Sequence, residues 1–583
     1  MDINSIIPPF DYTELIMNKM RLLNKHNKNK YQKISLKILG GYTFDEVNNW
    51  IKIFNYKYNI DTNIENSDWG SGYNNTIIYL NNKKFHDVVL VFNSYLDLIE
   101  ENNFQINKTI FKQILRTYKQ FFEIMNNKNI QVIFNLYDYL QFVEAEKITL
   151  QNKYLVDQLN IKLFNLSKKY KNIFLIDPTF NFNKAGLNNS LDMRNWNFYG
   201  NIFDLEQSIM LSYNYSIVFR SLYYSTKKII VLDLDNTLWG GVIGDTNINN
   251  IKINSDEAEG RIYIQFQNYL KCLKNKGILL AICSKNDENI VKNAFKKLKM
   301  PLSYSDFTIK KINWEHKYLN ILEISKELNL NLNSFVFIDD NPIERDEINN
   351  YLSEVSTPNI GSDPSKFIDI IDLNQFFKSY LPLTKEDLKR ETMYEAAKKI
   401  NEDKLKYSNY LDFLKSLNIN INFENLSNIN HNRVHQLLNK TNQFNLTTNR
   451  VTIGFLKNDL KNKWKFVISA FDKYGDHGII SFIYGSKKEK KIYIENWVMS
   501  CRVFNKYIEN TIIFFLKNIA FKNDKISEIE ATLIENPKNK VLKNFLNKIG
   551  FEAKKESNSK ITYSLKTNNL KYVKGVVGLN DKR

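Results

Sequence analysis

Residues Ile229–Gly241 read IIVLDLDNTLWGG, and this stretch decides the fold of the central part of the chain. Its first four residues are apolar and mostly branched, which is typical of a short strand buried on both faces of a parallel sheet. Asp233 and Asp235 follow, and the alternation of a strand turns both carboxylates to the same side just past its carboxyl end. Open α/β sheets bind their ligands at that edge. We therefore expect a ligand site there rather than a plain polar turn.

Further polar residues follow the same pattern along the next part of the sequence. A strand predicted at 278–283 is followed by Ser284, a strand predicted at 335–338 is followed by Asp339 and Asp340, and Lys317 opens a helix. Phosphoryl transfer requires a nucleophile, an acid/base and positive charge around the phosphoryl oxygens. Carboxylates also supply the oxygen ligands that Mg²⁺ prefers. The pattern therefore indicates a phosphoryl-transfer site.

These segments resemble the four motifs of the haloacid dehalogenase superfamily, in the family's order. The resemblance implies that Asp233 is the nucleophile that forms an aspartyl-phosphate and that Asp235 is the general acid/base. The implied phosphate-binding residues are Thr237, Ser284, Lys285 and Lys317. The implied ligands of a Mg²⁺ cofactor are Asp233, the backbone carbonyl of Asp235, and Asp339 or Asp340.

Five segments sharpen the resemblance to the FkbH-like branch of that superfamily. They are Leu238–Gly241, Ile282–Asn286, Phe337–Pro342, Thr441–Thr448 and Ser500–Val503. This branch implies a Rossmann-like (SGNH-like) first domain, a haloacid-dehalogenase-type second domain and a last domain resembling GNAT acyltransferases. It also implies transfer of a glyceryl group from an acyl phosphate such as 1,3-bisphosphoglycerate to the phosphopantetheine arm of an acyl carrier protein. Polyketide, other secondary-metabolite and surface-glycan pathways use such enzymes.

The hydrophobic patterns predict an α/β protein of several domains. Strands at 34–39, 87–92, 130–134 and 173–176 indicate a first α/β domain over 1–225. No complete catalytic set occurs in it, so we expect a docking or structural role. The phosphatase-like domain spans 226–372, a helical connector 373–425, and an α+β domain 426–567 with strands at 466–471, 479–484 and 492–499. Residues 568–583 are expected to form a flexible tail.

An acyl thioester requires a sulfur atom, and the chain has 3 cysteines. Cys272 lies in a helical stretch, so we expect it in the core. Cys283 precedes Ser284 on a buried strand, and alternation turns it away from the phosphate, so it is expected to serve packing. Cys501 ends a strand just before a helix and stands beside Arg502, which favours a thiolate.

A hairpin supplies a possible base for Cys501. With a turn at 486–490, antiparallel pairing places His477 opposite Met499, close to the sulfur. His477 is then a candidate catalytic base, and the alternative is a histidine in a polar turn beside a structural cysteine.

The turn at 502–507 departs from the Arg-x-x-Gly-x-Gly/Ala sequence with which GNAT folds bind the pyrophosphate of coenzyme A. Both small residues are replaced, by Asn505 and Tyr507. Side chains in the turn hinder the approach of phosphate to its backbone amides, so acetyl-CoA is not the expected ligand. A phosphopantetheine arm presented by a carrier protein, which brings a single phosphate monoester, remains possible.

The amino-acid composition limits the kinds of partner that we expect this protein to bind. The formal net charge is +18, but the basic residues are scattered and mostly Lys, without an Arg cluster or nucleic-acid motif. We therefore expect no nucleic acid, and an acidic carrier protein as the partner. Neither a signal peptide nor a membrane span is predicted, so we expect a cytoplasmic protein without disulfides.

Together these features predict a bifunctional phosphatase/acyltransferase. Two alternatives remain, a Mg²⁺-dependent phosphatase acting on a sugar phosphate and a non-catalytic scaffold module of a biosynthetic complex. A mass gain on a carrier protein is expected only from the first.

Overall fold

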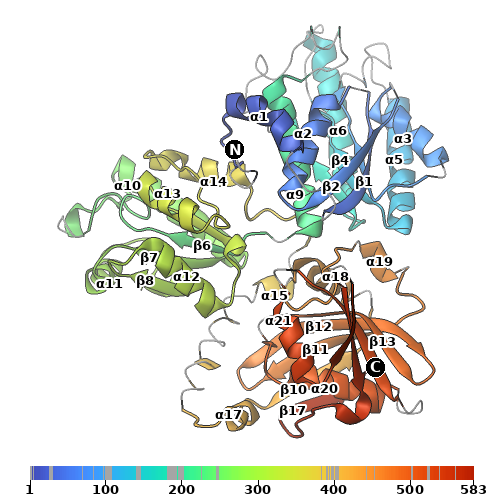
Figure 1. The fold of residues 1–583 in the computed structure, drawn as a ribbon. Coiled ribbons are helices and arrows are strands. Elements are labelled where there is room, and N and C mark those ends of the chain that lie inside the picture. Colours follow the sequence, from blue (N-terminus) through green and yellow to red (C-terminus); the bar gives the residue numbers. More distant parts are fainter. Residues whose placement is uncertain are drawn as a thin grey trace. The chain divides into compact units, whose positions relative to one another are not determined.

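The structure is a computed structural model of the chain, drawn in Figure 1. It describes residues 3, 6–24, 31–41, 43–68, 70–82, 84–95, 98, 108–138, 146–179, 194, 198, 203–224, 226–243, 248–382, 384–388, 392, 394, 399–400, 403, 406–427, 429–441, 443–451, 453–457, 459–500, 503–521, 526–536, 539–557 and 560–583. Three sheets organise these residues, which confirms an α/β protein of several domains. Within the described residues, no helix is both long and apolar enough to cross a membrane.

The first sheet is parallel and lies in a compact unit formed mainly by Phe10–Tyr224. Its strand order is β2-β1-β3-β4-β5. The strands are β1 (Gln32–Leu39), β2 (Ile60–Asn66), β3 (Val88–Val91), β4 (Gln131–Asn135) and β5 (Ile173–Ile176). The helices include α1 (Tyr12–Asn24), α2 (Asp45–Tyr56), α3 (Gly72–Asn81), α5 (Lys108–Lys128), α6 (Glu146–Ser167) and α9 (Leu205–Tyr223). The sequence patterns missed β2 because this edge strand buries only Ile60 and Thr62, and Ile64 is its one other apolar residue.

The second sheet is also parallel, with the order β8-β7-β6-β9. Its strands are β6 (Ile229–Leu232), β7 (Leu279–Ser284), β8 (Ile309–Ile312) and β9 (Phe335–Ile338). Its helices are α10 (Ala258–Asn275), α11 (Glu288–Lys297), α12 (Lys317–Leu328), α13 (Pro342–Tyr351) and α14 (Phe367–Asn374). One apolar cluster packs α10, α11 and α14 on one face, and another packs α12 and α13 on the other. Because β6 lies between β7 and β9, the chain that follows it emerges at the middle of the carboxyl edge.

Two cysteines lie in this domain, and only one is placed as expected. Cys283 is buried in the cluster opposite to the one that contains Ile282, so alternation does turn it to the packing side. Cys272 is exposed, so the prediction that it belongs to the core is wrong. The buried positions of α10 include Phe266, Leu270 and Leu273, and Cys272 lies on the other side of that helix.

The third sheet has the order β15-β16-β14-β13-β12-β11-β10-β17 and is antiparallel except for the pairs β13/β14 and β10/β17. Its strands are β10 (Ile419–Glu424), β11 (Trp464–Asp472), β12 (Gly475–Lys488), β13 (Lys491–Met499), β14 (Glu528–Ile534), β15 (Glu552–Ser557), β16 (Lys560–Lys566) and β17 (Val577–Asp581). The helices α17 (Tyr410–Ser416), α20 (Ile508–Phe515) and α21 (Val541–Lys548) pack on one face, and α18 (His431–Lys440) and α19 (Ile453–Lys457) on the other.

Both ends of the predicted third domain need correction. The segment 568–583 is not a flexible tail, because β17 pairs in parallel with β10 along the whole strand. β10 itself lies within 373–425, which was predicted as a helical connector, so the sheet begins before residue 426. β17 is a short edge strand whose pairing partner is distant in sequence, so it gives no strong local signal. β10 lies between β11 and β17 and buries Ile419, Ile421 and Phe423 in alternation, a strand pattern that the prediction of a helical connector overlooked.

The hairpin that was to bring His477 opposite Met499 has a different register. β12 continues to Lys488 and β13 begins at Lys491, so a two-residue turn joins them. Met499 consequently pairs with Ser481, four residues beyond the predicted partner. The lysine-rich sequence at the end of β12 was interpreted as a turn, although its backbone continues the ladder.

A segment of the chain lies between β13 and β14. These strands pair in parallel only as far as Ile494 and Ala531. Beyond that point Leu446 N donates to the carbonyl of Trp497 on β13 at 3.2 Å, and Leu446 O accepts from Ile534 N on β14 at 2.8 Å. We call Phe444–Leu446 the wedge, since it bonds to both strands where they separate.

Buried asparagines hold the wedge. Asn445 Nδ2 donates to the carbonyls of Leu438 and Thr441, each at 3.2 Å. Asn539 Nδ2 donates to the carbonyl of Asn445 at 3.1 Å and to that of Ile534 at 2.9 Å. A buried amide that loses its partners costs the full desolvation of those groups, so the network fixes one position of the wedge.

We expect Asn445→Ala to loosen the wedge, because it leaves buried carbonyls without their donor, at a cost of about 1–3 kcal/mol. Hydrogen exchange of peptides covering 441–448, read by mass spectrometry, should become faster. The matched control is Asn449→Ala, which removes an exposed amide from the same loop. Equal exchange in the two variants would contradict the role given to Asn445.

Candidate active site

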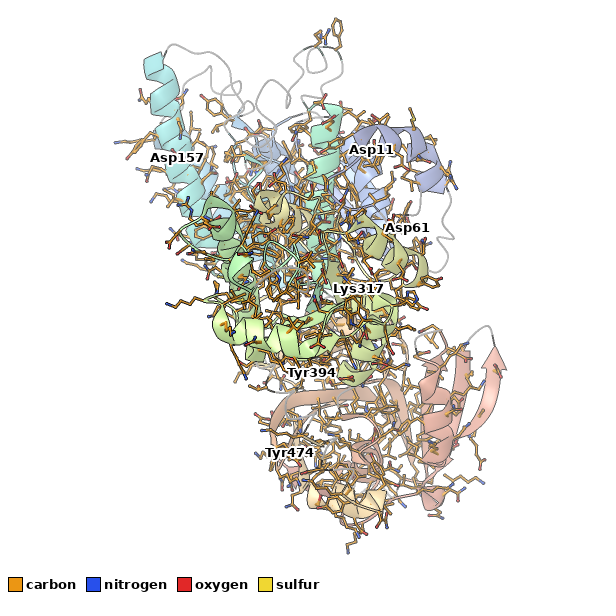
Figure 2. All side chains as sticks on the ribbon, turned by 90° about the vertical axis from the view of Figure 1, so that its left-hand side faces the viewer. Asp11, Asp61, Asp157, Lys317, Tyr394 and Tyr474 are labelled. Carbon is orange, nitrogen blue, oxygen red and sulfur yellow. The ribbon has the colours of Figure 1, made fainter. Side chains whose placement is uncertain are left out.

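Lys317, the first residue of α12, joins two carboxylates at the carboxyl edge of the second sheet. Its Nζ lies 3.0 Å from Asp233 Oδ1 and 2.6 Å from Asp339 Oδ2. All three side chains are buried, and Lys317 is labelled in Figure 2. Asp233 follows β6 and Asp339 follows β9, and Asp233 N donates to the carbonyl of Ile338 at 3.0 Å. The prediction that these strand ends meet is thus confirmed.

The electrostatics of this cluster favour a cation. Burial lowers the pKa of Lys317, but Asp233 and Asp339 outweigh it and hold that pKa well above its ordinary value. Burial, together with the charge of Asp233, raises the pKa of Asp339 and that of Asp340. One ammonium group therefore does not balance the carboxylates, which remain costly to ionise without further positive charge.

Three carboxylates fit a metal ion. Oxygens of Asp233, Asp339 and Asp340 lie within 4.8 Å of one another. Arg345 fixes the backbone of the acidic pair, since its Nη1 donates to the carbonyls of Asp339 and Asp340 at 2.7 Å each. The hard oxygen donors and the excess negative charge suit Mg²⁺.

Asp235 has different partners from the other carboxylates. Its Oδ1 accepts from Trp239 Nε1 at 2.9 Å and from Ile243 N at 3.2 Å, and its Oδ2 accepts from Asn286 Nδ2 at 3.0 Å. Burial raises the pKa of Asp235, although these hydrogen bonds partly oppose the effect. A carboxyl group fixed in this way and raised toward neutral pH suits proton transfer.

The hydroxyl groups lie in the cluster, whereas Lys285 has another partner. Thr237 Oγ1 donates to Asp340 Oδ1 at 3.3 Å, and Ser284 Oγ accepts from Asn286 Nδ2 at 3.2 Å. Lys285 Nζ pairs with Glu344 Oε1 at 2.6 Å. A phosphate-binding role for Lys285 therefore requires that it exchange Glu344 for the substrate.

Three residues that contact this site were not assigned a role from the sequence, although two of them lie within the quoted motif segments. Asn286 stands two residues after Ser284, and Trp239 stands four residues after Asp235, spacings that could have suggested contact. Arg345 gave no sequence signal, because it reaches the acidic pair from one turn inside α13.

The other predicted catalytic residues belong to the third sheet. Cys501 lies outside the described residues, so its proximity to His477 stays a prediction. His477 is described, and its Nε2 lies 2.8 Å from Asp472 Oδ2. Asp472, which ends β11 on the other side of the tight turn, was not among the predicted site residues.

The turn before α20 keeps a left-handed backbone. Asn505 has φ 63° and Tyr507 has φ 62°, at the two positions where a glycine-rich turn would carry small residues. Asn505 N donates to Glu509 Oε1 at 2.7 Å, and Glu509 is buried. The backbone N–H of Asn505 is therefore hydrogen-bonded to a carboxylate of the protein and is not available to a phosphate group. This is consistent with the expectation that coenzyme A is not the ligand.

Comparisons with known proteins were informative only at the level of structure. No protein-family model and no curated protein matches the sequence. The N-terminal part of the Bacteroides fragilis protein BF1531, described as containing a phosphatase domain complexed with Mg, is 26% identical, with a TM-score of 0.58. That match covers 64% of this chain and 99% of the other.

Acetyltransferase structures match a smaller part of the chain. A chimera of spermidine N-acetyltransferase SpeG from Vibrio cholerae is 10% identical, covering 25% of this chain and 96% of the other, with a TM-score of 0.21. PaiA N-acetyltransferase from Thermoplasma acidophilum, in complex with coenzyme A, is 20% identical with a TM-score of 0.16, and the match covers 20% of this chain and 66% of the other.

The acidic cluster predicts binding of Mg²⁺ without substrate. Asp340→Asn should weaken this binding by about tenfold or more, because it removes one charged ligand. Calorimetric titration with MgCl₂ measures the change. The control is Asp346→Asn, an exposed carboxylate on α13 that stands outside the cluster. Unchanged affinity in the Asp340 variant would remove this residue from the site.

Proposed function

We propose that the chain is a Mg²⁺-dependent phosphatase of the haloacid dehalogenase type, joined to an acyltransferase that loads a carrier protein. The observation that carries the first part is Lys317 between Asp233 and Asp339, with Asp340 completing an acidic cluster. The similarity to a protein whose phosphatase domain was crystallised with Mg supports it.

The proposed reaction begins with attack of an Asp233 carboxylate oxygen on phosphorus. A P–O bond forms to Asp233 while the bond to the leaving oxygen breaks, and Asp235 donates a proton to that oxygen. Water then attacks phosphorus, forming a new P–O bond while the P–O bond to Asp233 breaks. Asp235 accepts the proton of that water, and inorganic phosphate leaves. Lys317, Ser284 and Thr237 would bind the phosphoryl oxygens throughout.

A metal ion held by Asp233, the Asp235 carbonyl and Asp339 or Asp340 would supply further positive charge at the phosphoryl oxygens. Trp239 and Asn286 serve the same reaction by fixing the carboxylate of Asp235. The two neighbouring aspartates of the opening motif therefore divide their tasks because their hydrogen-bond partners differ.

For the second part, we propose that the C-terminal domain is a GNAT-like acyltransferase acting on a three-carbon acyl group such as glyceryl. The Cys501 thiolate would attack the carbonyl carbon of an acyl phosphate, forming a C–S bond and expelling phosphate. The phosphopantetheine thiol of the carrier would then take the acyl group and release the Cys501 thiol. The net charge of +18 favours an acidic carrier protein. Glu509 at the start of α20, which accepts from Asn505 N in the turn, disfavours coenzyme A.

The N-terminal domain is proposed to dock or stabilise rather than to catalyse. Polar residues at the carboxyl edge of its sheet bond to one another, as shown by Asn93, which accepts from Tyr118 Oη at 2.5 Å and donates to the carbonyl of Asn135 at 2.8 Å. The buried Asp138 also takes part, since its Oδ1 accepts from Ser94 Oγ at 3.3 Å and from Tyr95 N at 3.0 Å. These bonds within the domain support a structural role.

Asp233→Asn should lower the rate of phosphate release by several orders of magnitude, because it removes the nucleophilic carboxylate but keeps a side chain of nearly the same shape. Release of inorganic phosphate from sugar phosphates, which cannot acylate Cys501, measures the loss. Asp256→Asn, which changes an exposed carboxylate of the same domain, serves as the control. Near-native turnover in the Asp233 variant would refute the phosphatase assignment.

Cys501→Ser should eliminate mass gain on the acyl carrier protein, since an alkoxide does not replace the thiolate at neutral pH. Cys272→Ser and Cys283→Ser should retain transfer, because the first is exposed and the second packs in the core. Incubation with donor but without carrier should leave an acyl adduct on the peptide that contains Cys501. An adduct on Cys283 would place acyl chemistry in the phosphatase domain instead.

A further inference from the structure

A histidine and a buried carboxylate form a pair at one end of the third sheet. His477 Nε2 lies 2.8 Å from Asp472 Oδ2. The side chain of Asp472 is 1% exposed, whereas that of His477 is 13% exposed. The carboxylate is thus almost completely shielded from water, whereas a small part of the His477 side chain remains exposed.

A β-bulge places His477 in this position. The consecutive residues Ala470 and Phe471 of β11 pair with Gly478 and Asp476 of β12, so His477 is the extra residue of the bulge. Bulges redirect a side chain relative to the regular alternation of a strand, and they are frequent next to active sites. Gly478, with φ 64°, provides the left-handed residue that follows the bulge.

Both oxygens of Asp472 have partners. Oδ1 accepts from Tyr474 N at 2.9 Å, and Oδ2 faces the imidazole of His477. Tyr474, labelled in Figure 2, lies in the turn between the two strands. Burial raises the pKa of Asp472, but the hydrogen bond and charge of His477, the Tyr474 N–H and Lys506 together outweigh it and hold that pKa below its ordinary value. The carboxylate therefore stays ionised and can accept a hydrogen bond from Nε2.

Three further charged residues lie near the pair or interact with its neighbours. Lys506 interacts electrostatically with Asp472 and with Glu509, and burial lowers the pKa of Lys506. Burial also raises the pKa of Glu509 to about 7. Asp476, the neighbour of His477, accepts from Gly478 N at 2.8 Å instead of facing the ring. Asp472 is therefore the carboxylate that the hydrogen-bond geometry assigns to the imidazole.

We infer that Asp472 is a positioning residue that holds the proton of His477 on Nε2, so that Nδ1 serves as the base for an incoming thiol. This inference rests on the proposed acyltransferase function. The proton of the phosphopantetheine thiol moves to Nδ1, and the thiolate forms a C–S bond to the acyl carbon. The C–S bond to Cys501 then breaks, and the proton returns from Nδ1 to the released sulfur.

The position of the ring proton can be read without any turnover. The 15N signals of the 6 histidines report the tautomer of each ring at a pH where histidine is neutral, and His477→Gln identifies the signals of His477. In the full-length wild type we expect the proton on Nε2. In Asp472→Asn the amide oxygen keeps the Tyr474 N–H, so the amide NH₂ faces Nε2 and should move the ring proton to Nδ1.

The matched control is Asp476→Asn, which changes the neighbouring carboxylate and should leave the tautomer of His477 unchanged. A wild-type ring protonated on Nδ1, or the same tautomer in wild type and folded Asp472→Asn, would overturn the inference. Because the wild-type result is decisive by itself, a variant that fails to fold does not remove the test.

Acyl transfer to a carrier protein provides the second readout. His477→Gln and Asp472→Asn should each lower kcat by about 10²- to 10⁴-fold with little change in KM, whereas Asp476→Asn should not. Near-native kcat in His477→Gln would overturn the base role even if the tautomer changes as expected. Absence of transfer in the wild type would refute the proposed function, and the 15N signals would still decide whether Asp472 holds the ring.

Discussion

The buried ion pairs of Lys317 are the constraint on which the phosphatase-like domain depends. An ammonium and two carboxylates are costly to bury, and the loss of Lys317 would leave two buried carboxylates without their counter-charge, which typically costs about 3–5 kcal/mol. Lys317 opens α12, and its partners end β6 and β9, so the fold must bring a helix start to the middle of the sheet. The arrangement contributes little to stability but fixes the site before any ligand arrives.

Local patterns were sufficient where a strand is buried on both faces and ends in charged residues. β6 and β9 begin and end where the sequence indicated, and Asp233, Asp339 and Lys317 meet as expected. The roles of Arg345 and of Glu344 as the partner of Lys285 could not be predicted, because they depend on the exact orientation of α13.

Prediction was weaker in the third sheet, since its edge strands and its hairpin register depend on contacts distant in sequence. β17 pairs with β10 across more than a hundred residues, a contact for which no local periodicity exists. The lysines of β12 were interpreted as a turn, which displaced the register by four residues and placed His477 opposite the wrong strand position. The bulge at His477 and the choice of Asp472 as its partner follow from backbone geometry that alternation alone does not encode.

The wedge also affects how the chain should behave when a protease cleaves it. Two parallel strands that separate expose two rows of unpaired backbone groups inside the sheet, and such edges recruit strands of other molecules. Phe444–Leu446 covers both rows at once through Trp497, Met499 and Ile534. A single cut in the loop that carries the wedge would open two interior edges simultaneously, so proteolysis at this point should convert a well-behaved domain into a template for intermolecular β-pairing.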